Sequence, residues 1–505
     1  MIQHLIVLPI VLPLVVGVFL LRSRHGASRY KRVIGVGATT ALLVVAISLV
    51  AKASSGEVSY YALGDWQPPF GIIMVLDRLS ALMVLITSVL ALGCVVFACA
   101  GDDEQGSNFH GLFQLQLMGI NGAFLTGDLF NLFVFFEVLL LASYALLMHG
   151  GGKARIQAGL HYVVLNLAGS SLFLIAVGVL YGATGTLNMT DMAVRLTELD
   201  PERAGLVSAG ALLLLVVFGL KGAILPLYFW LPRAYAAAPA PVAALFAIMT
   251  KVGIYAILRV YHLVFGEHAG ELAALEQPWV WWLSLATLVA SAIGVLAARD
   301  LRLLVSYLIL VSVGTLLAGI GMRTPQATSA LLFYLIHTTL VTGGLFLLAE
   351  LIGLQRGKAS TRLVKGRPLQ NAGLLALLFF VGAIAVIGLP PLSGAIGKVL
   401  LLKSASPAQQ LWLWPILLGA SLCALVALSR AGSTLFWRSH EGEPNRTPLT
   451  RRQLFGVLWL LGASPILMVL AGPVSDYTQA TAEQLSSPAP HIRAILPEAA
   501  AGGDA

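Results

Sequence analysis

Long apolar runs separated by short polar stretches repeat along the whole of this 505-residue chain. An α-helix needs about 20 predominantly apolar residues to cross the hydrocarbon core of a bilayer. A sliding window of about 19 residues predicts fourteen spans, at residues 2–21, 33–51, 77–99, 111–127, 128–149, 160–181, 204–231, 241–266, 279–298, 302–322, 328–353, 372–403, 411–437 and 453–473. The pattern therefore predicts an all-α polytopic membrane protein.

Composition supports a membrane protein without a soluble domain. Hydrophobic residues make up 58% of the chain and charged residues only 11%, whereas roughly a quarter of a soluble domain is charged. We interpret the net charge of +8 as basic loops on one side of a membrane, not as a nucleic-acid-binding surface. The cysteines Cys94, Cys99 and Cys423 lack metal-ligand spacing and are expected to be core residues.

The distribution of basic residues predicts an orientation. Loops after odd-numbered spans hold more than twice as many Lys and Arg residues as the loops on the opposite side. Basic loops stay in the cytoplasm, so both termini are expected on the outside. The first apolar run is expected to be a retained helix, because its positive charges follow it and do not precede it as in a signal peptide.

Two of the predicted spans are interrupted. The seventh contains Pro226, and the twelfth contains Gly388, Pro390 and Pro391 in its middle. Broken helices survive where they are packed in protein or line a wet cavity, and they often occur at corresponding places in internal repeats. We therefore predict two inverted five-helix repeats, spans 4–8 and 9–13, within the divisions 1–110 (helices 1–3), 111–270 (first repeat), 271–440 (second repeat), 441–476 (last helix) and 477–505 (disordered tail). Residues 55–72 are expected to form an interfacial hairpin or loop.

Four charged residues lie deep inside predicted spans: Glu137, Lys221, Lys251 and Lys398. Each charge at the centre of a bilayer costs about 2.5–3.5 kcal/mol on insertion scales. A static ion pair that locks two helices, such as Glu137 with Lys221, is the structural alternative. Three lysines cannot all be paired with one glutamate, so we interpret the set as functional.

Lysine and histidine are suited to proton transfer inside a membrane. Burial lowers the pKa of a lysine, and a nearby carboxylate raises it again. A lysine with an intermittent acidic partner, for which Glu137 is the candidate beside Lys221, can load and release a proton near neutral pH. His337, in the middle of the eleventh span, fits a relay. A neutral histidine hydrogen-bonded between helices is the equally weighted alternative.

Other polar residues in or near the spans are expected to be structural. Asp77, Arg78 and the run 299–302 lie at span ends and are expected to cap helices. His161 lies near a membrane edge, Arg430 is expected to extend towards the headgroups, and hydroxyls such as Ser170 are common at helix contacts.

The sequence contains no phosphate-binding glycine loop and no cluster of cysteine or histidine ligands. No cofactor or metal is therefore expected, and energy must come from an ion gradient or a partner.

Five motifs together resemble one superfamily. They are DRLSALM at 77–83, FEVLLLASYALL at 136–147, FGLKGAILPLYFWLPRAYAAAPAPVAAL at 218–245, RDLRLLVSY at 299–307 and GLPPLSGAIGK at 388–398. They are similar to the antiporter-like subunits shared by respiratory complex I, membrane-bound hydrogenases and the Mrp (or Pha) cation/proton antiporters. The resemblance covers nearly the whole chain, and it is greatest to the D-type member of an Mrp antiporter.

The resemblance implies roles for the buried residues. Glu137 and Lys221 match the paired carboxylate and lysine of the first half-channel, and Lys251 matches the central connecting lysine. His337 matches a relay position, and Lys398 matches the lysine of the distal half-channel. Where the family motif usually reads DLK, this chain has Arg302. Because arginine does not readily release a proton, we interpret this position as structural.

The function implied by the resemblance is proton translocation coupled to Na⁺ or K⁺ efflux, in a bacterial inner membrane. The partners implied are the other antiporter subunits, of the A, B, C, E, F and G types, and the lipid bilayer, with no nucleic acid. A transporter subunit is not itself an enzyme. The alternatives are a membrane-arm subunit of an NADH:quinone oxidoreductase or hydrogenase, and a scaffold without transport.

Overall fold

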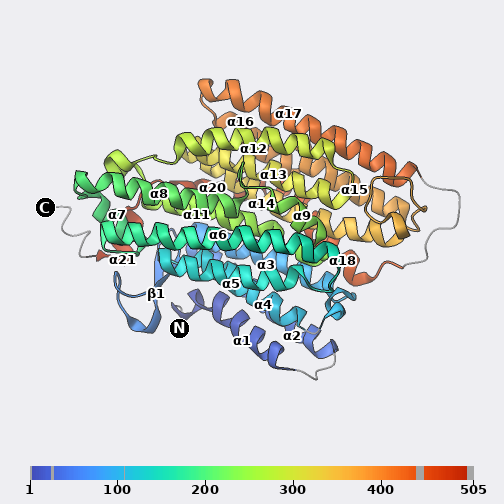
Figure 1. The fold of residues 1–505 in the computed structure, drawn as a ribbon, viewed down its shortest axis with the longest axis horizontal. Coiled ribbons are helices and arrows are strands. Elements are labelled where there is room, and N and C mark those ends of the chain that lie inside the picture. Colours follow the sequence, from blue (N-terminus) through green and yellow to red (C-terminus); the bar gives the residue numbers. More distant parts are fainter. Residues whose placement is uncertain (1–2, 24–27, 107, 439–447, 498–505) are drawn as a thin grey trace.

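The structure is a computed structural model of the chain that describes residues 3–23, 28–106, 108–438 and 448–497. Nearly all of this part is helical (Figure 1). The helices are α1 (Leu8–Arg22), α2 (Ser28–Ala53), α3 (Arg78–Ala98), α4 (Phe109–Leu125), α5 (Leu129–Leu147), α6 (Lys153–Thr184), α7 (Met189–Thr197), α8 (Pro201–Gly222), α9 (Trp230–Ala237), α10 (Ala240–Leu245), α11 (Met249–Leu263), α12 (Gln277–Ala297), α13 (Leu301–Gly321), α14 (Pro325–Gln355), α15 (Ala372–Ile387), α16 (Ser393–Ser404), α17 (Pro407–Gly432), α18 (Arg451–Leu461), α19 (Ala463–Val469), α20 (Ala471–Leu485) and α21 (Ala489–Ile495).

The prediction of a polytopic helical membrane protein is confirmed. Within the described residues, 11 helices are long and apolar enough to cross a membrane, and α1 and α15 are shorter apolar helices. Every predicted span overlaps a helix or a pair of consecutive helices. The count of fourteen spans and the inverted relation of the two repeats stay predictions.

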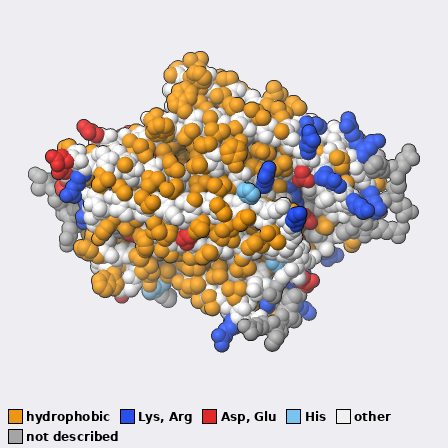
Figure 2. All heavy atoms as spheres, viewed as in Figure 1, with side chains coloured by type: hydrophobic (Ala, Val, Ile, Leu, Met, Phe, Trp, Pro, Cys, Tyr) orange, Lys and Arg blue, Asp and Glu red, His pale blue; other side chains and the backbone are white. Residues whose placement is uncertain are grey.

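The long helices run side by side along the longest axis of the molecule (Figure 1). Figure 2 shows apolar side chains across the middle of this face, whereas Lys and Arg side chains gather at the right-hand end. The start of α1 and the C-terminal helix α21 lie towards the left-hand end (Figure 1). On this face, basic side chains are therefore concentrated at one end, and the predicted sidedness of the basic loops stays a prediction.

The segment predicted as an interfacial hairpin or loop is a hairpin. Strands β1 (Ser59–Ala62) and β2 (Ile73–Leu76) pair antiparallel, with Ser59 opposite Leu76 and Ala62 opposite Ile73. β2 is buried along its whole length, while β1 is half-buried. The hairpin leads directly into α3, whose first residue follows the capping Asp77.

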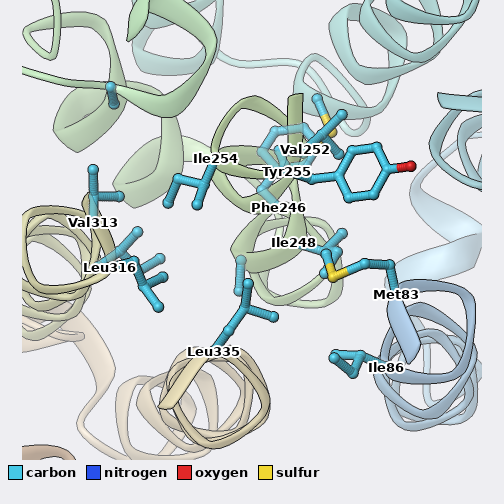
Figure 3. Close-up of a cluster of buried hydrophobic side chains, with 14 of the residues drawn as sticks. Met83, Ile86, Phe246, Ile248, Val252, Ile254, Tyr255, Val313, Leu316 and Leu335 are labelled. Atoms are coloured by element: carbon cyan, nitrogen blue, oxygen red, sulfur yellow. The ribbon is translucent and has the colours of Figure 1, made fainter. Parts of the chain in front are cut away.

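The centre of the molecule is built from α11 and α14. The most apolar parts of the stretches Ala240–Leu263 and Pro325–Gln355 are entirely buried within the protein, which is the expected environment of a helix that is hydrophobic all round. Figure 3 shows this packing: Met83 of α3, Val252 of α11, Val313 of α13 and Leu335 of α14 meet in one cluster. Lys251 and His337 lie on these two central helices.

Both predicted helix breaks are present. After α8, Ala223 adopts a left-handed conformation with φ of 62°, and the chain resumes as a helix only at α9. After α15, Gly388 adopts φ of 87°, and α16 begins at Ser393. The last carbonyl groups of α8 and α15 therefore lack the amide partners of a continuous helix, which places free acceptors deep in the protein.

The prediction that residues 477–505 form a disordered tail is wrong for residues 477–497. α20 and α21 cover most of this part, and the His491 side chain is 2% exposed. His491 Nε2 lies 3.0 Å from Asp77 Oδ2, and Tyr477 donates a 3.0 Å hydrogen bond to the carbonyl of Arg78. The segment is ordered by polar contacts to residues far away in sequence, which a hydropathy window does not detect. Residues 498–505 lie outside the described part.

Candidate functional site

Four of the five predicted site residues are buried inside the protein, and the fifth is partly buried. The exposed fractions of Lys221, Lys251, His337 and Lys398 are 7%, 0%, 1% and 5%. Glu137 is half-buried on α5. A charged or titratable group in such surroundings needs polar partners, so the identity of each partner decides what the residue can do.

Helix α6 connects Glu137 with Lys221. Ser170 donates a short hydrogen bond to the carboxylate of Glu137, and Asn166 Oδ1 accepts from Lys221 Nζ at 3.3 Å. Asn166 and Ser170 are four residues apart, so they lie one above the other on the same face of α6. The glutamate and the lysine do not form an ion pair. They are joined through one turn of a third helix.

The ammonium group of Lys221 borders an aromatic pocket. Nζ lies 5.9 Å from the ring centroid of Phe136, a cation–π distance. A cavity of about 10 Å³ is lined by Lys221, Asn166, Tyr162 and Trp230, and on its other side by Met249 of α11. This is close to the space that one water needs. The cavity lies between Lys221 and the helix that carries Lys251.

Lys251 occupies the most enclosed position of the set. Its Nζ donates to Ser312 Oγ of α13 at 3.3 Å. The neighbouring Thr250 is also 0% exposed, and its hydroxyl has no hydrogen-bond partner among the described residues.

His337 is part of a row of hydroxyl groups. Its Nδ1 lies 2.8 Å from Ser393 Oγ at the start of α16, and Ser393 Oγ lies 2.9 Å from Ser464 Oγ of α19. A serine hydroxyl both donates and accepts. The row is therefore a continuous hydrogen-bonded path from α14 to α19.

Lys398 uses the break between α15 and α16. Its Nζ donates to the carbonyl of Ile387 at 2.7 Å and to Ser421 Oγ at 2.8 Å, with the carbonyl of Val386 at 3.4 Å. The last carbonyls of a helix carry its negative dipole end. The broken helix thus supplies the electronegative surroundings that a carboxylate would otherwise provide.

The three lysines share a property that the sequence does not reveal. In the part of the chain that the structure describes, none of them forms an ion pair, and their acceptors are an amide oxygen, hydroxyls and backbone carbonyls. A neutral acceptor can accept a hydrogen bond from either an amine or an ammonium, and it favours the ammonium less strongly than a carboxylate does. The surroundings therefore do not commit these lysines to the charged form, as a tightly bound carboxylate would.

Comparison with known proteins identifies the relatives of this arrangement. The family described as "NADH:quinone oxidoreductase/Mrp antiporter, TM" matches residues 126–423, more than half of the chain. The chain belongs to this family. The matched region contains all five predicted site residues, and the resemblance inferred from the motifs is confirmed.

Two relatives and one solved structure extend the likeness beyond the matched region. The chain is 42% identical to the D-type member of a probable K(+)/H(+) antiporter of Rhizobium meliloti (strain 1021), covering 99% of both chains. It is 36% identical to the D-type member of a Na(+)/H(+) antiporter of Bacillus subtilis (strain 168), covering 98% of this chain and 100% of the relative. A chain of the Mrp complex from Dietzia sp. DQ12-45-1b has 26% identity and a TM-score of 0.87, over 98% of this chain and 100% of that one.

Several residues expected to be structural have structural partners in this member of the family. The side chains of Asp77 and Asp300 accept hydrogen bonds from backbone amides in the first turns of α3 and α13. Arg302, the departure from the family motif, forms an ion pair with Glu350 and donates to the carbonyl of Ala238. Arg430 is exposed and donates to the carbonyl of Leu296 at the end of α12. These contacts support the capping and anchoring interpretations.

Sequence reasoning missed most of the partners. Asn166, Ser312, Ser393 and Ser421 each contact a predicted site residue. Of the residues that contact a predicted site residue, only Ser170 was singled out, as a residue that could line a water path but is more simply explained as a helix-contact residue. Small polar residues are frequent wherever transmembrane helices pack. Only the three-dimensional contact distinguishes the ones that touch a lysine.

The close approach of α8 and α11 next to Lys221 gives a testable prediction. A Cβ added at Gly253 would overlap the backbone nitrogen of Gly222, whereas a Cβ added at Gly222 would lie 3.8 Å from Ile254 in ordinary contact. We expect Gly253→Ala to destabilise the protein by roughly 1–3 kcal/mol, the usual cost of overpacking. The matched Gly222→Ala variant should be tolerated. Melting temperatures of the two purified variants measure this, and equal values would contradict the packing described here.

Proposed function

We propose that this chain is the proton-translocating membrane subunit of a multisubunit monovalent cation/proton antiporter. Protons would pass along Glu137, Lys221, Lys251, His337 and Lys398. The observation that carries the proposal is that the three lysines are buried and hydrogen-bonded to neutral acceptors, while His337 is buried in a row of hydroxyl groups. Charges in a membrane interior are costly and typically mark ion pathways and proton relays.

The contacts suggest how a proton moves through the first half of the path. Glu137 takes up a proton and passes it through the hydroxyl of Ser170 and intermittent water to Lys221, whose amino group is held by Asn166. The cavity next to Lys221 gives room for a water on the side of α11, where Lys251 is the next station. Charge on one buried lysine disfavours charge on the next, so the arrival of a proton at Lys221 promotes release further along.

The second half of the path depends on the other broken helix. His337 contacts Ser393, the first residue of α16, and Lys398 lies on the same short helix. A change in the charge of Lys398 alters the strength of its hydrogen bond to the carbonyl of Ile387. The geometry of the break between α15 and α16 would change as a result. This arrangement offers a route from the central lysine to the opposite side of the membrane.

The assignment to an antiporter rests on likeness over the whole chain to proteins that are named as antiporter subunits of the D type. By the same likeness, the partners are the other subunits of such a complex. The location in a bacterial inner membrane is part of this proposal, and the placement of both termini outside rests on the distribution of basic residues among the predicted loops. The relatives' names include both K⁺ and Na⁺, so either ion is a candidate for the exchanged cation. The chain acts as part of a transporter and not as an enzyme.

The proposal is tested by transport in inverted vesicles from an antiporter-deficient host. The host expresses the complete complex, and the dissipation of a pH gradient on addition of Na⁺ or K⁺ is recorded. We expect the wild-type complex to exchange protons and Glu137→Ala to lose most of this activity. Glu202→Ala removes an exposed acid at the start of α8 and should leave transport unchanged. Full activity of Glu137→Ala would remove this residue from the mechanism.

The alternative function is that of a membrane-arm subunit of an NADH:quinone oxidoreductase or hydrogenase. It is kept because the family description also covers NADH:quinone oxidoreductases. In that case the same lysines would respond to electron transfer in neighbouring subunits. A purified complex that reduces quinone with NADH, and shows no exchange driven by Na⁺ or K⁺, would favour this alternative.

A further inference from the structure

A basic cavity lies at the end of the molecule where α2, α3 and α18 meet, apart from the buried lysines. Its volume is about 370 Å³, and its lining includes Arg32, Cys99, Glu104, Thr450, Arg451 and Arg452. Arg32 lies near the start of α2, and the two other arginines begin α18. The cavity therefore joins the N-terminal helices to the C-terminal part of the chain.

Among the described residues that line the cavity, basic side chains outnumber acidic ones. Arg32 is neutralised by Asp103 behind it, with Nε–Oδ2 and Nη2–Oδ1 distances of 2.7 and 2.8 Å, and it also contacts Glu104. Burial by itself would raise the pKa of Asp103, but the hydrogen bonds from Arg32 and His110 hold it at about 2. Asp103 therefore stays charged and keeps Arg32 in place.

The two arginines of α18 are left to attract an anion. Arg451 and Arg452 are exposed, and Arg452 donates to the carbonyl of Cys99 at 2.6 Å while its guanidinium carries further N–H groups for another acceptor. They are also the first residues of an 11-residue helix, whose N-terminal end carries a partial positive charge. Two guanidinium groups and a helix dipole thus point to a ligand with a phosphate or a similar anionic group.

The surface next to the cavity is apolar. Phe455 and Leu458 follow Arg451 at positions i+4 and i+7, so they continue the same face of α18, and they are 42% and 47% exposed. The exposed Ile466 and Val469 of α19, at 57% and 81%, lie further along the same stretch of chain. A free phosphate would make no favourable contact with this apolar surface, whereas the acyl chains of a lipid would pack against it.

We propose that this cavity binds the anionic headgroup of a phospholipid, whose acyl chains lie along the exposed face of α18. Basic pockets between transmembrane helices are suited to anionic headgroups. The bound lipid would contact three segments, namely α2, α18 and the loop that follows α3. The stability of the complex would then depend on anionic lipid. The proposal is independent of the proton path, so either can fail without the other.

The test is a lipid titration of the purified, delipidated complex, followed by native mass spectrometry. We expect the wild-type complex to bind phosphatidylglycerol about tenfold more tightly than phosphatidylcholine, given the effect of one or two basic residues on anionic lipid binding. Arg451→Gln and the double variant Arg451→Gln/Arg452→Gln should lose this preference. Arg451→Gln leaves the hydrogen bond from Arg452 to the carbonyl of Cys99 in place. A loss of lipid preference in this variant is therefore not explained by the loss of that structural contact.

The matched control is Lys365→Gln/Arg367→Gln, which removes two exposed charges that do not line the cavity. It should bind phosphatidylglycerol like the wild type. An unchanged preference in both arginine variants would overturn the proposal, and so would displacement of phosphatidylglycerol by inorganic phosphate at equal concentration. Loss of another subunit from the double variant, without any change in lipid binding, would assign the surface to a protein partner instead.

Discussion

Replacing Lys221 with alanine is expected to lower cation-driven proton exchange by roughly 100-fold, the typical effect of removing a proton-transfer group. The reason lies in the contacts of the side chain, because Lys221 links Asn166 of α6 to the cavity that faces α11. Lys221→Arg should fail as well, because arginine keeps its proton. The measurement is the initial rate of pH change in inverted vesicles, normalised to the amount of assembled complex.

Two further variants show whether the loss comes from the proton path. Lys153→Ala removes an exposed lysine at the start of α6 and should retain wild-type exchange. Glu137 and Lys221 are stations of one path, so the double variant Glu137→Ala/Lys221→Ala should be no slower than the slower single variant. Wild-type exchange in Lys221→Ala would instead support the scaffold interpretation, in which the buried charges have no role in transport.

Breaking the ion pair between Asp77 and Arg259 is expected to have the largest effect on stability. Arg259 Nη2 donates to Asp77 Oδ1 at 2.8 Å, Nη1 contacts Oδ2, and His491 of α21 binds the same carboxylate. Asp77 and Arg259 are 1% and 4% exposed. Removing one partner leaves the other charge buried, which costs roughly 3–5 kcal/mol. Asp77→Asn should therefore lower the melting temperature of the complex and the amount of this protein in the membrane.

The choice of asparagine separates the ion pair from the helix cap. Asparagine caps a helix as well as aspartate does, so the start of α3 keeps its side-chain hydrogen bond. Glu57→Ala, at an exposed acid before β1, should have no effect. Combining Asp77→Asn with Arg259→Met removes both charges and should recover part of the stability. A melting temperature of Asp77→Asn equal to that of the wild type would show that the pair contributes little.

The sequence alone predicted the helices, both breaks and the five ionisable positions. These predictions were possible because a bilayer admits few backbone structures and makes each buried charge costly. Glu137 and Lys398 can be recognised from the local sequence alone, because each is a charged residue within an apolar run. Family membership added a role for each residue, and those roles stay predictions.

Tertiary structure decided which groups surround those positions. The sequence suggested Glu137 as the direct partner of Lys221, but Ser170 and Asn166 lie between them. The sequence also suggested a disordered end, whereas His491 reaches Asp77 across 414 positions. Apolar content and spacing are local properties that a window along the chain detects. A hydrogen bond between distant residues depends on how the helices pack, and many sequences with the same hydropathy would pack differently.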